Sequence, residues 1–387
     1  MHTYAIKTAF ATILCLTGGG KINIYALVMH NYESKTAAKT PVGIVGARGY
    51  SGLELARLLL QHPQAHLKSC FATDASFQLS DYLPEAAAGK VRTEEMSDLI
   101  SKAGSLNTVF LATPAEVSLE LAPKLIRAGV NVIDLSGAFR LEENSYNEWY
   151  AFNHNCPELL AQAEYGLVPW AGPARLTEGA RLIANPGCYA TSVLMGILPL
   201  LKSTVIYADT IVIDAKSGTT GAGKKASENL LFSEVEGECL PYKVGKHQHF
   251  PEICRFAQKL SNTTINPHFS TSLINVRRGI ISGIYARLAN GKTSVDVAQA
   301  YQSAYENYPL VTFSALDPKT SGSALSLKKV VGSARTHIRY HVDGDKLYVY
   351  SLIDNLMKGA ASQAIENFNR LLELPVSTAL TQQEGTL

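Results

Sequence analysis

Short apolar segments alternate with amphipathic segments through the first half of the chain. The pattern predicts strands at residues 42–46, 66–72, 108–112 and 130–135, and helices at residues 53–61 and 116–128. Strands that are apolar along their whole length are typical of a parallel sheet covered on both faces. We therefore expect residues 41–187 to form a Rossmann-like, doubly wound parallel sheet of the α/β class, which is a nucleotide-binding architecture.

The second half has a different pattern, in which several strand-like segments carry polar residues at alternate positions. These segments lie at residues 210–215, 270–276, 282–288 and 346–352, and amphipathic helices are predicted at residues 295–305 and 358–372. The alternation predicts a mixed, largely antiparallel sheet with one face open or used for association. We expect an α+β domain at residues 188–354 that forms a homo-oligomer through this sheet, and a C-terminal helix at 355–374 that completes the first domain.

The two ends of the chain do not fit this pattern. Residues 8–16 are apolar, but the stretch is too short to span a membrane and is not followed by the cleavage site of a signal peptide. We expect residues 1–40 to be a poorly ordered extension, and our hypothesis is that translation was assigned from a start codon too far upstream of Met29. The polar residues 375–387 are expected to form a frayed tail.

Composition narrows the class of protein. The 387 residues are 46% hydrophobic and 18% charged, which describes a soluble globular protein, and the net charge of +2 argues against nucleic acid as a partner. The six cysteines are scattered, with no Cys-x-x-Cys pair. This usage fits reduced thiols in a cytoplasmic enzyme better than a disulfide framework, and we expect no association with a membrane.

The sequence ANPGCYATS at residues 184–192 is the most informative stretch of the chain. Pro186 and Gly187 predict a sharp turn after a short strand, and residues 189–201 have the pattern of an apolar helix. Cys188 would then lie at the first turn of that helix, where unpaired backbone N–H groups and the helix dipole favour the thiolate. On this stretch alone, a buried structural cysteine remains the alternative.

Residues 46–52 form a Gly-x-x-Gly-x-x-Gly turn between a predicted strand and a predicted helix. Gly46 permits a tight turn, and Gly49 lets the backbone approach a pyrophosphate closely. The helix N-terminus then supplies N–H donors and a favourable dipole. In this context the motif predicts dinucleotide binding rather than a purely structural turn.

Two further segments are candidates for contact with a dinucleotide. After the second strand, Thr73, Asp74 and Ser76 leave open whether the site takes a ribose 2′-hydroxyl or a 2′-phosphate. Residues 216–225 form a second glycine-rich loop directly after a strand, with lysines suited to phosphate. A flexible surface loop is the alternative for this second segment.

The sequence KVGKHQHFPE at residues 243–252 places His247 and His249 two residues apart. A zinc site would also have to recruit Cys239 or Cys254, and with no further ligand to complete it we expect no metal. A general acid–base role fits better, since histidine titrates near neutral pH. A histidine near Cys188 would complete the nucleophile–base pair of covalent catalysis.

Together these segments resemble the N-acetyl-γ-glutamyl-phosphate reductase family. The likeness covers the chain from Val42 to Leu372 and rests on matched segments in the same order: VGIVGARGYSGLEL, VIDLSGAFRL, LIANPGCYATS, DAKSGTTGAGKKASE, YKVGKHQHFPEI, RRGI and IDNLMKGAASQAIEN. The resemblance implies NADPH-dependent reduction of N-acetyl-L-glutamyl 5-phosphate to N-acetyl-L-glutamate 5-semialdehyde through a cysteine thioester, in arginine biosynthesis. It also implies a homo-oligomer, either a dimer or a tetramer.

The resemblance further implies roles for individual residues. Cys188 would be the nucleophile and His247 the acid–base, with His249 as the second choice. Arg140 and Arg278, together with His249, would contact the substrate. NADP(H) would be bound by the glycine turn and a few further positions, namely Gly46, Ala47, Arg48, Gly49, Tyr50, Ser51, Gly52, Thr73, Ser217, Gly218 and Asn355.

Two residues and one short segment depart from the usual pattern of that family. Arg48 replaces a small hydroxyl residue, residues 113–116 replace a segment with histidine and glycine, and Arg277 replaces an asparagine. The closest alternative is a related acyl-phosphate reductase of the aspartate-semialdehyde or aminoadipate-semialdehyde type. A catalytically silent nucleotide-binding regulator is the alternative from another class, and the intact Cys188 and His247 argue against it.

Overall fold

The computed structural model describes residues 38–74, 76–172 and 179–381. Residues 1–37 of the expected extension and residues 382–387 of the expected tail lie outside these ranges. The expectation of a frayed tail is wrong for residues 375–381. Leu380 is buried, and the side-chain amide of Asn369 donates hydrogen bonds to the carbonyl oxygens of Val376 and Thr378 at 3.0 Å each.

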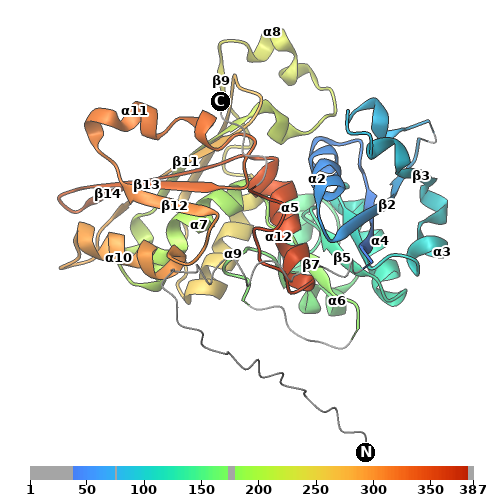
Figure 1. Ribbon diagram of the computed structural model, residues 1–387. Helices are drawn as coiled ribbons and strands as arrows, with labels where there is room; N and C mark the ends of the chain where they lie inside the picture. The colour runs from blue at the N-terminus through green and yellow to red at the C-terminus, as the bar shows by residue number, and fades with distance from the viewer. Residues whose placement is uncertain (1–37, 75, 173–178, 382–387) are drawn as a thin grey trace, which may run out of the picture. The chain divides into compact units, whose positions relative to one another are not determined.

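The first sheet has seven strands in the order β3-β2-β1-β4-β5-β7-β6 (Figure 1). Their bounds are β1 Thr40–Val45, β2 Ala65–Ala72, β3 Arg92–Glu95, β4 Thr108–Leu111, β5 Asn131–Asp134, β6 Glu164–Tyr165 and β7 Leu182–Ala184. All neighbouring strands in it are parallel. The predicted doubly wound parallel sheet is confirmed.

Helices cover both faces of this sheet because successive side chains of each strand point to opposite sides. Ile44 packs with α2 (Tyr50–Gln61) and α12 (Ser362–Leu371). Its neighbour Val45 packs on the other side with α3 (Leu99–Ala103), α4 (Ala115–Arg127) and α5 (Tyr146–Tyr150). Helix α12, coloured red in Figure 1, lies against α2 although the two helices are at opposite ends of the chain.

The second sheet also has seven strands, in the order β12-β13-β14-β11-β8-β10-β9. Their bounds are β8 Val212–Gly218, β9 Cys239–Pro241, β10 His268–Ile274, β11 Ile280–Arg287, β12 Val311–Ala315, β13 Thr336–Asp343 and β14 Lys346–Ile353. The β8–β10 and β12–β13 pairs are parallel and the others are antiparallel. The mixed, largely antiparallel sheet is therefore confirmed, although β9, β12 and β13 were missing from the sequence prediction.

One face of the second sheet packs against α7 (Cys188–Lys202), α9 (His249–Ser261) and α10 (Ser294–Tyr305) around a single apolar core. Helix α9 was not predicted from the sequence, and it proves important for the site. The remaining α-helices are short, namely α6 Pro157–Gln162, α8 Phe232–Val235 and α11 Ser321–Ala324. A π-helix spans Met357–Ala361, and short 3₁₀-helices occur in several connections. Within the ranges given above, no helix is both long and apolar enough to cross a membrane.

Candidate active site

A cavity of about 570 Å³ is lined by residues from both domains, the one that contains the first sheet and the one that contains the second. The first residues of three helices line it: Tyr50 of α2, Cys188 of α7 and His249 of α9. Each helix N-terminus presents unpaired backbone N–H groups and the positive end of a dipole. Three such ends around one cavity favour a ligand that carries several negative charges, such as phosphates.

The glycine turn fits a dinucleotide on steric grounds. Gly46 has a φ of +86°, and a Cβ there would overlap the carbonyl oxygen of Ala112. A Cβ at Gly52 would overlap the carbonyl oxygen of Gly46, whereas a Cβ at Gly49 would contact only that oxygen, at 3.5 Å. Since no side chain caps α2 and its first turn holds no acidic residue, its N-terminal N–H groups are left for an anion.

The second glycine-rich loop also lines the cavity. Thr220, Gly221 and Asn355 line the cavity, and the Asn355 side-chain amide donates to Oγ1 of Thr220 at 3.0 Å. Ser217 and Gly218 lie behind them, because a Cβ at Gly221 would be 2.8 Å from Oγ of Ser217. Asn355 is thus placed to contact a cofactor directly, and Ser217 and Gly218 support the loop from behind.

Cys188 begins α7 directly after Gly187, as the sequence predicted. Its side chain is half-buried, and Gly359 of the π-helix packs so closely that a Cβ there would be 2.8 Å from Cβ of Cys188. Burial raises the pKa of Cys188 to about 11, although the backbone N–H of Tyr189 and the charge of Arg140 act to lower it. The predicted bias towards thiolate is therefore outweighed by desolvation, and the group needs a base.

The two predicted histidines are both buried and lie 4.8 Å apart between ring centroids. Nδ1 of His247 accepts a hydrogen bond from the backbone N–H of His249 at 3.1 Å, and its Nε2 lies 3.4 Å from Oη of Tyr242. A neutral His247 therefore carries its proton on Nε2. His249 packs directly against the residue before the cysteine, because a Cβ at Gly187 would overlap its Nε2.

Burial keeps both histidines neutral. It lowers the pKa of His247 to about 3, with a contribution from the charge of Lys243. It also lowers the pKa of His249, with the ring of His247 and the charge of Arg140 acting in the same direction. Nδ1 of His249 is buried without a hydrogen-bond partner, so this ring retains a free position towards its surroundings.

Glu252 is a site residue that the sequence analysis missed. It is fully buried, and its Oε1 accepts hydrogen bonds from the backbone N–H of Gly187 and from Oη of Tyr165, both at 2.8 Å. His249 and Glu252 are three positions apart in the first turn of α9, which places them on one face of the helix. The His-x-x-Glu spacing at a helix start was the available signal.

Arg140 lines the cavity and is held mainly by backbone oxygens. Its Nε donates to the carbonyl of Asn185 at 2.8 Å and its Nη2 to that of Leu135 at 2.7 Å. The remaining Nη1 lies 3.5 Å from Oε2 of Glu252. One guanidinium nitrogen is thus only loosely paired, which suits contact with an anionic substrate group.

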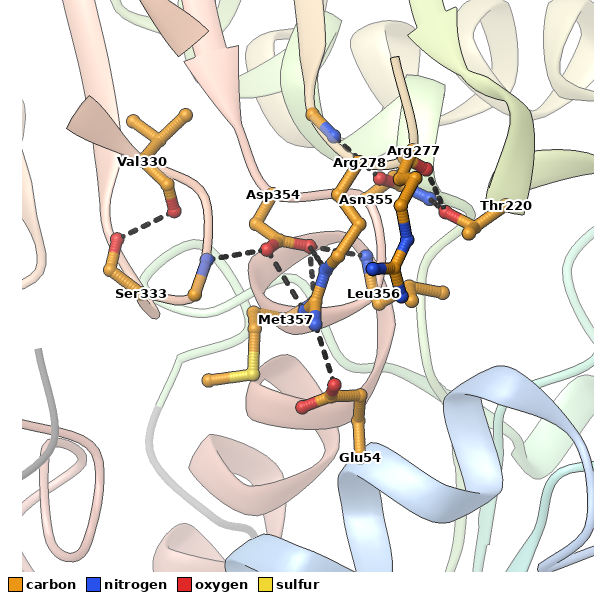
Figure 2. A network of polar contacts seen from close by, with 12 residues as sticks. Glu54, Thr220, Arg277, Arg278, Val330, Ser333, Asp354, Asn355, Leu356 and Met357 are labelled. Carbon is orange, nitrogen blue, oxygen red and sulfur yellow. Dashed lines mark hydrogen bonds and ion pairs between the residues drawn. The ribbon is translucent and has the colours of Figure 1, made fainter. Parts of the chain in front are cut away.

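Arg278 does not line the cavity, so the geometry does not favour the predicted contact with substrate. Its Nη1 lies 2.6 Å from Oε1 of Glu54, and its Nη2 lies 2.9 Å from Oδ2 of Asp354. Figure 2 shows Arg278 between Glu54 on α2 and Asp354 after β14. Asp354 also accepts backbone hydrogen bonds from Gly332 and Leu356. The arginine therefore ties the cofactor helix to the strand end that precedes Asn355.

Of the remaining predicted residues, Arg48 and Thr73 are exposed or partly exposed outside the cavity lining, near the end of β2. Ala47 is buried under the glycine turn. Among residues 38–74, 76–172 and 179–381, no group of three histidine, cysteine or acidic side chains is arranged to hold a metal ion.

The architecture resembles solved semialdehyde dehydrogenases. A Vibrio cholerae structure described as aspartate semialdehyde dehydrogenase II complexed with ASA has a TM-score of 0.61 at 16% identity and covers 87% of this chain and 99% of its own. A probable aspartate-semialdehyde dehydrogenase from Pseudomonas aeruginosa has a TM-score of 0.61 at 19% identity, with the same coverage. At such identities the likeness concerns the fold alone.

Sequence comparison gives the family. Residues 41–177 match the family described as "Semialdehyde dehydrogenase, NAD binding domain", and residues 188–355 match "Semialdehyde dehydrogenase, dimerisation domain". N-acetyl-gamma-glutamyl-phosphate reductase from Brevibacillus brevis is 39% identical over 343 residues, covering 88% of this chain and 97% of the relative. The enzyme of that name from Geobacillus stearothermophilus is 41% identical over 339 residues, covering 86% and 95%. The chain belongs to the N-acetyl-gamma-glutamyl-phosphate reductase family.

Proposed function

We propose that the protein reduces N-acetyl-L-glutamyl 5-phosphate with NADPH to N-acetyl-L-glutamate 5-semialdehyde and phosphate, a step of arginine biosynthesis. One observation carries the proposal: the Cys188 thiol and the N-terminus of α2 line the same cavity. A nucleophile and a dinucleotide turn in one cavity suit formation of an acyl-enzyme followed by its reduction. The identity to two reductases of known name supports the choice of substrate.

The cofactor would be held by the glycine turn, by the N-terminus of α2 and by Asn355. When bound, NADPH supplies the hydride that reduces the acyl group on the enzyme. The chain's part is to hold the reacting groups together and to exclude water from them. The close packing of Gly359 against Cα and Cβ of Cys188 helps to hold this residue in place.

The first chemical step needs the Cys188 proton to be removed. His249 is the better placed of the two histidines to take it, because its ring abuts Gly187 whereas both nitrogens of His247 have neighbours in Tyr242 and the His249 backbone. The sulfur then attacks the acyl carbon, the C–S bond forms, and the C–O bond to phosphate breaks with its electron pair leaving on phosphate, which takes up a proton from water. The positive imidazole and Arg140 stabilise the negative charge that develops.

The second step returns the enzyme to its starting state. Once the thioester carbon is reduced, the oxygen on this tetrahedral carbon re-forms a carbonyl, the C–S bond breaks, and its electron pair returns to sulfur. His249 gives its proton back to the Cys188 sulfur, so the thiol and the neutral imidazole are restored together. Glu252 orients this site through its hydrogen bond to the Gly187 backbone and its pairing with Arg140.

Arg140 is the candidate for binding the substrate's phosphate or carboxylate. Arg140 lines the cavity, its Nη1 is loosely paired, and its other nitrogens are anchored by carbonyl oxygens. An anchored guanidinium is preorganised, so less side-chain entropy is lost when an anion binds. This role is proposed for Arg140 and no longer for Arg278.

The protein is further proposed to act as a homo-oligomer in the cytoplasm. The match to a family described as a dimerisation domain supports association, and the open face of the second sheet carries the half-buried Tyr285, Tyr348 and Tyr350. The cysteines within the described ranges are free thiols, which fits a reducing compartment. A dimer or a tetramer is the expected state, and light scattering of the purified chain distinguishes them.

An enzyme assay tests the proposed function. The purified protein should reduce NADP⁺ in the presence of phosphate and N-acetyl-L-glutamate 5-semialdehyde, and should be inactive when phosphate is omitted. Aspartate semialdehyde is the matched control substrate, because the solved structures of similar fold bear its name. Equal or higher activity with aspartate semialdehyde would contradict the proposal, and inactivity with both substrates would favour a non-catalytic protein.

A further inference from the structure

Arg48 and Asp74 lie close together where the glycine turn meets the end of β2. Nη1 of Arg48 is 3.4 Å from Oδ2 of Asp74, and the two side chains are 60% and 45% exposed. In a doubly wound domain, the residues after the second strand face the adenosine ribose. A free carboxylate there accepts hydrogen bonds from the ribose hydroxyls and repels a 2′-phosphate. Whether Asp74 is free therefore bears on which dinucleotide binds.

Both oxygens of Asp74 already have partners. Oδ1 accepts hydrogen bonds from the backbone N–H of Ser76 at 3.0 Å and from its hydroxyl at 2.6 Å. Oδ2 faces the guanidinium of Arg48. The Ser76 hydrogen bonds, with a smaller effect of Arg48, lower the pKa of Asp74, so the carboxylate is ionised and its charge must be balanced. Its geometry is that of a turn-stabilising residue rather than of a free ribose ligand.

A second cation reaches the same place from a distant part of the sequence. Lys224 belongs to the glycine-rich loop after β8, and its Nζ lies 3.4 Å from the carbonyl oxygen of Arg48. The same Nζ lies 4.7 Å from the ring centroid of Tyr82. Two cations from the two domains thus meet at this turn: Arg48 faces the hydrogen-bonded carboxylate of Asp74, and Lys224 reaches the backbone of Arg48. This arrangement favours an additional anion.

We infer that Arg48 and Lys224 form the subsite for the 2′-phosphate of the dinucleotide, and that Arg48 shields the phosphate from Asp74. A phosphate monoester carries a charge of about −1.5 to −2 at neutral pH, and arginine binds it through two parallel hydrogen bonds. Arg48 thus converts a strand end with an acidic residue into one that takes NADP(H) in preference to NAD(H). The inference rests on the proposed function because it concerns the cofactor of that reaction.

Direct binding measurements test the subsite without relying on turnover. In isothermal titration, Arg48→Ser should weaken NADP⁺ binding by ~10-fold to ~100-fold, since a charge-assisted contact is lost. NAD⁺ binding should change by less than about twofold, as for an ordinary exposed substitution. Arg127→Ser is the matched control, since Arg127 is an exposed arginine at the far end of α4. It should leave both affinities unchanged.

Three further measurements test whether the site is a 2′-phosphate subsite or a general anion site. Adenosine 2′-monophosphate should compete with NADP⁺ on the wild-type protein better than adenosine 5′-monophosphate does, and this advantage should vanish in Arg48→Ser. Asp74→Asn should tighten NADP⁺ binding several-fold, because a repelling charge is removed. Lys224→Ser should weaken NADP⁺ binding less than Arg48→Ser does.

The outcomes are decisive for the inference. If Arg48→Ser weakens NADP⁺ and NAD⁺ by the same factor, Arg48 contacts the pyrophosphate and the inference is wrong. If Arg48→Ser leaves NADP⁺ binding unchanged, it is wrong as well. Failure of the proposed function appears differently, as lack of reductase activity in the wild-type protein while dinucleotide binding persists.

Discussion

Arg140 and Arg278 both face carboxylates, yet the two guanidinium groups have different surroundings. Arg278 lies between Glu54 and Asp354, and each of its three side-chain nitrogens is within 3.3 Å of a carboxylate oxygen (Figure 2). Arg140 is held by two carbonyl oxygens and lies 3.5 Å from its carboxylate partner. The charge of Arg278 is neutralised by its partners, whereas Arg140 keeps positive charge at the cavity.

The comparison shows that a buried arginine in a motif is informative only together with its partners. Two carboxylates compensate the charge of Arg278, so its contribution is to join α2 to the strand end before Asn355. Carbonyl oxygens orient Arg140 without cancelling its charge, so it can still attract an anion. The ionisable groups of the two regions also differ in charge. The cavity contains neutral histidines and a thiol, whereas the joint, by which we mean Arg278 with Glu54 and Asp354, contains ion pairs. The predictions below test this contrast.

Replacing the nucleophile should have the largest effect on turnover and little effect on properties outside the cavity. Cys188→Ser should lower the turnover rate by ~10³-fold or more, since an unactivated hydroxyl is a far weaker nucleophile at neutral pH. Affinity for NADP⁺ and the free energy of unfolding should change little, because the two side chains are nearly equal in size. Steady-state kinetics with isothermal titration measures both, and near wild-type turnover would overturn the mechanism.

Replacing the histidines separately should rank them. His249→Asn should lower kcat by ~10²-fold or more, the usual contribution of a general acid–base group. His247→Asn should lower kcat by less, because an amide still accepts the hydrogen bond from the His249 backbone. A larger loss in the His247 variant would restore that residue as the acid–base. Circular dichroism at the assay temperature verifies that both variants are folded.

Removing an ion pair from the joint should lower the free energy of unfolding more than it lowers kcat. Glu54→Gln removes one carboxylate from Arg278, and we expect a loss of about 2 kcal/mol in the free energy of unfolding, between the values for exposed and buried pairs. Glu120→Gln is the matched control, because its pair with Lys124 on α4 is exposed to solvent and should contribute much less to stability than the pair of Glu54 with Arg278. Urea denaturation measures both. A fall in kcat of Glu54→Gln by ~10²-fold with unchanged stability would place Glu54 and Arg278 in the catalytic site.

As the pH falls, the contribution of the cavity histidine His247 to stability should be lost before the contribution of Glu54 in the joint. Since the pKa of His247 is lowered to about 3 from 6.5, the unfolded chain binds more protons below pH 6.5, and stability is lost as the pH falls from 6.5 towards 3. At pH 5.5 this loss is about 1.4 kcal/mol relative to pH 8, and His247→Asn should remove it. The pKa of Glu54 is lowered from 4.5, so its contribution is lost only at lower pH. Equal acid sensitivity of variant and wild type would contradict the burial of a neutral His247.

The fold was largely predictable because its signals are local. Apolar runs and alternating runs differ within a few residues, and they separated the parallel sheet from the mixed sheet. The missing elements are instructive: β9 has three residues and forms only by pairing with β10, and α9 begins inside a segment noted for its histidines. Without α9 there was no reason to place Glu252 beside Gly187, which is 65 positions away.

The sequence by itself determined the distinction between a parallel and a mixed sheet, the tight glycine turn and the position of Cys188 at a helix start. Each depends on side-chain period or backbone sterics within a few residues. Only the tertiary structure decided the burial of the cysteine, the surroundings of the two histidines, the different partners of Arg140 and Arg278, and the surroundings of Asp74. Those properties depend on desolvation and on charges contributed by distant segments, such as Glu54 and Arg278, which are 224 positions apart.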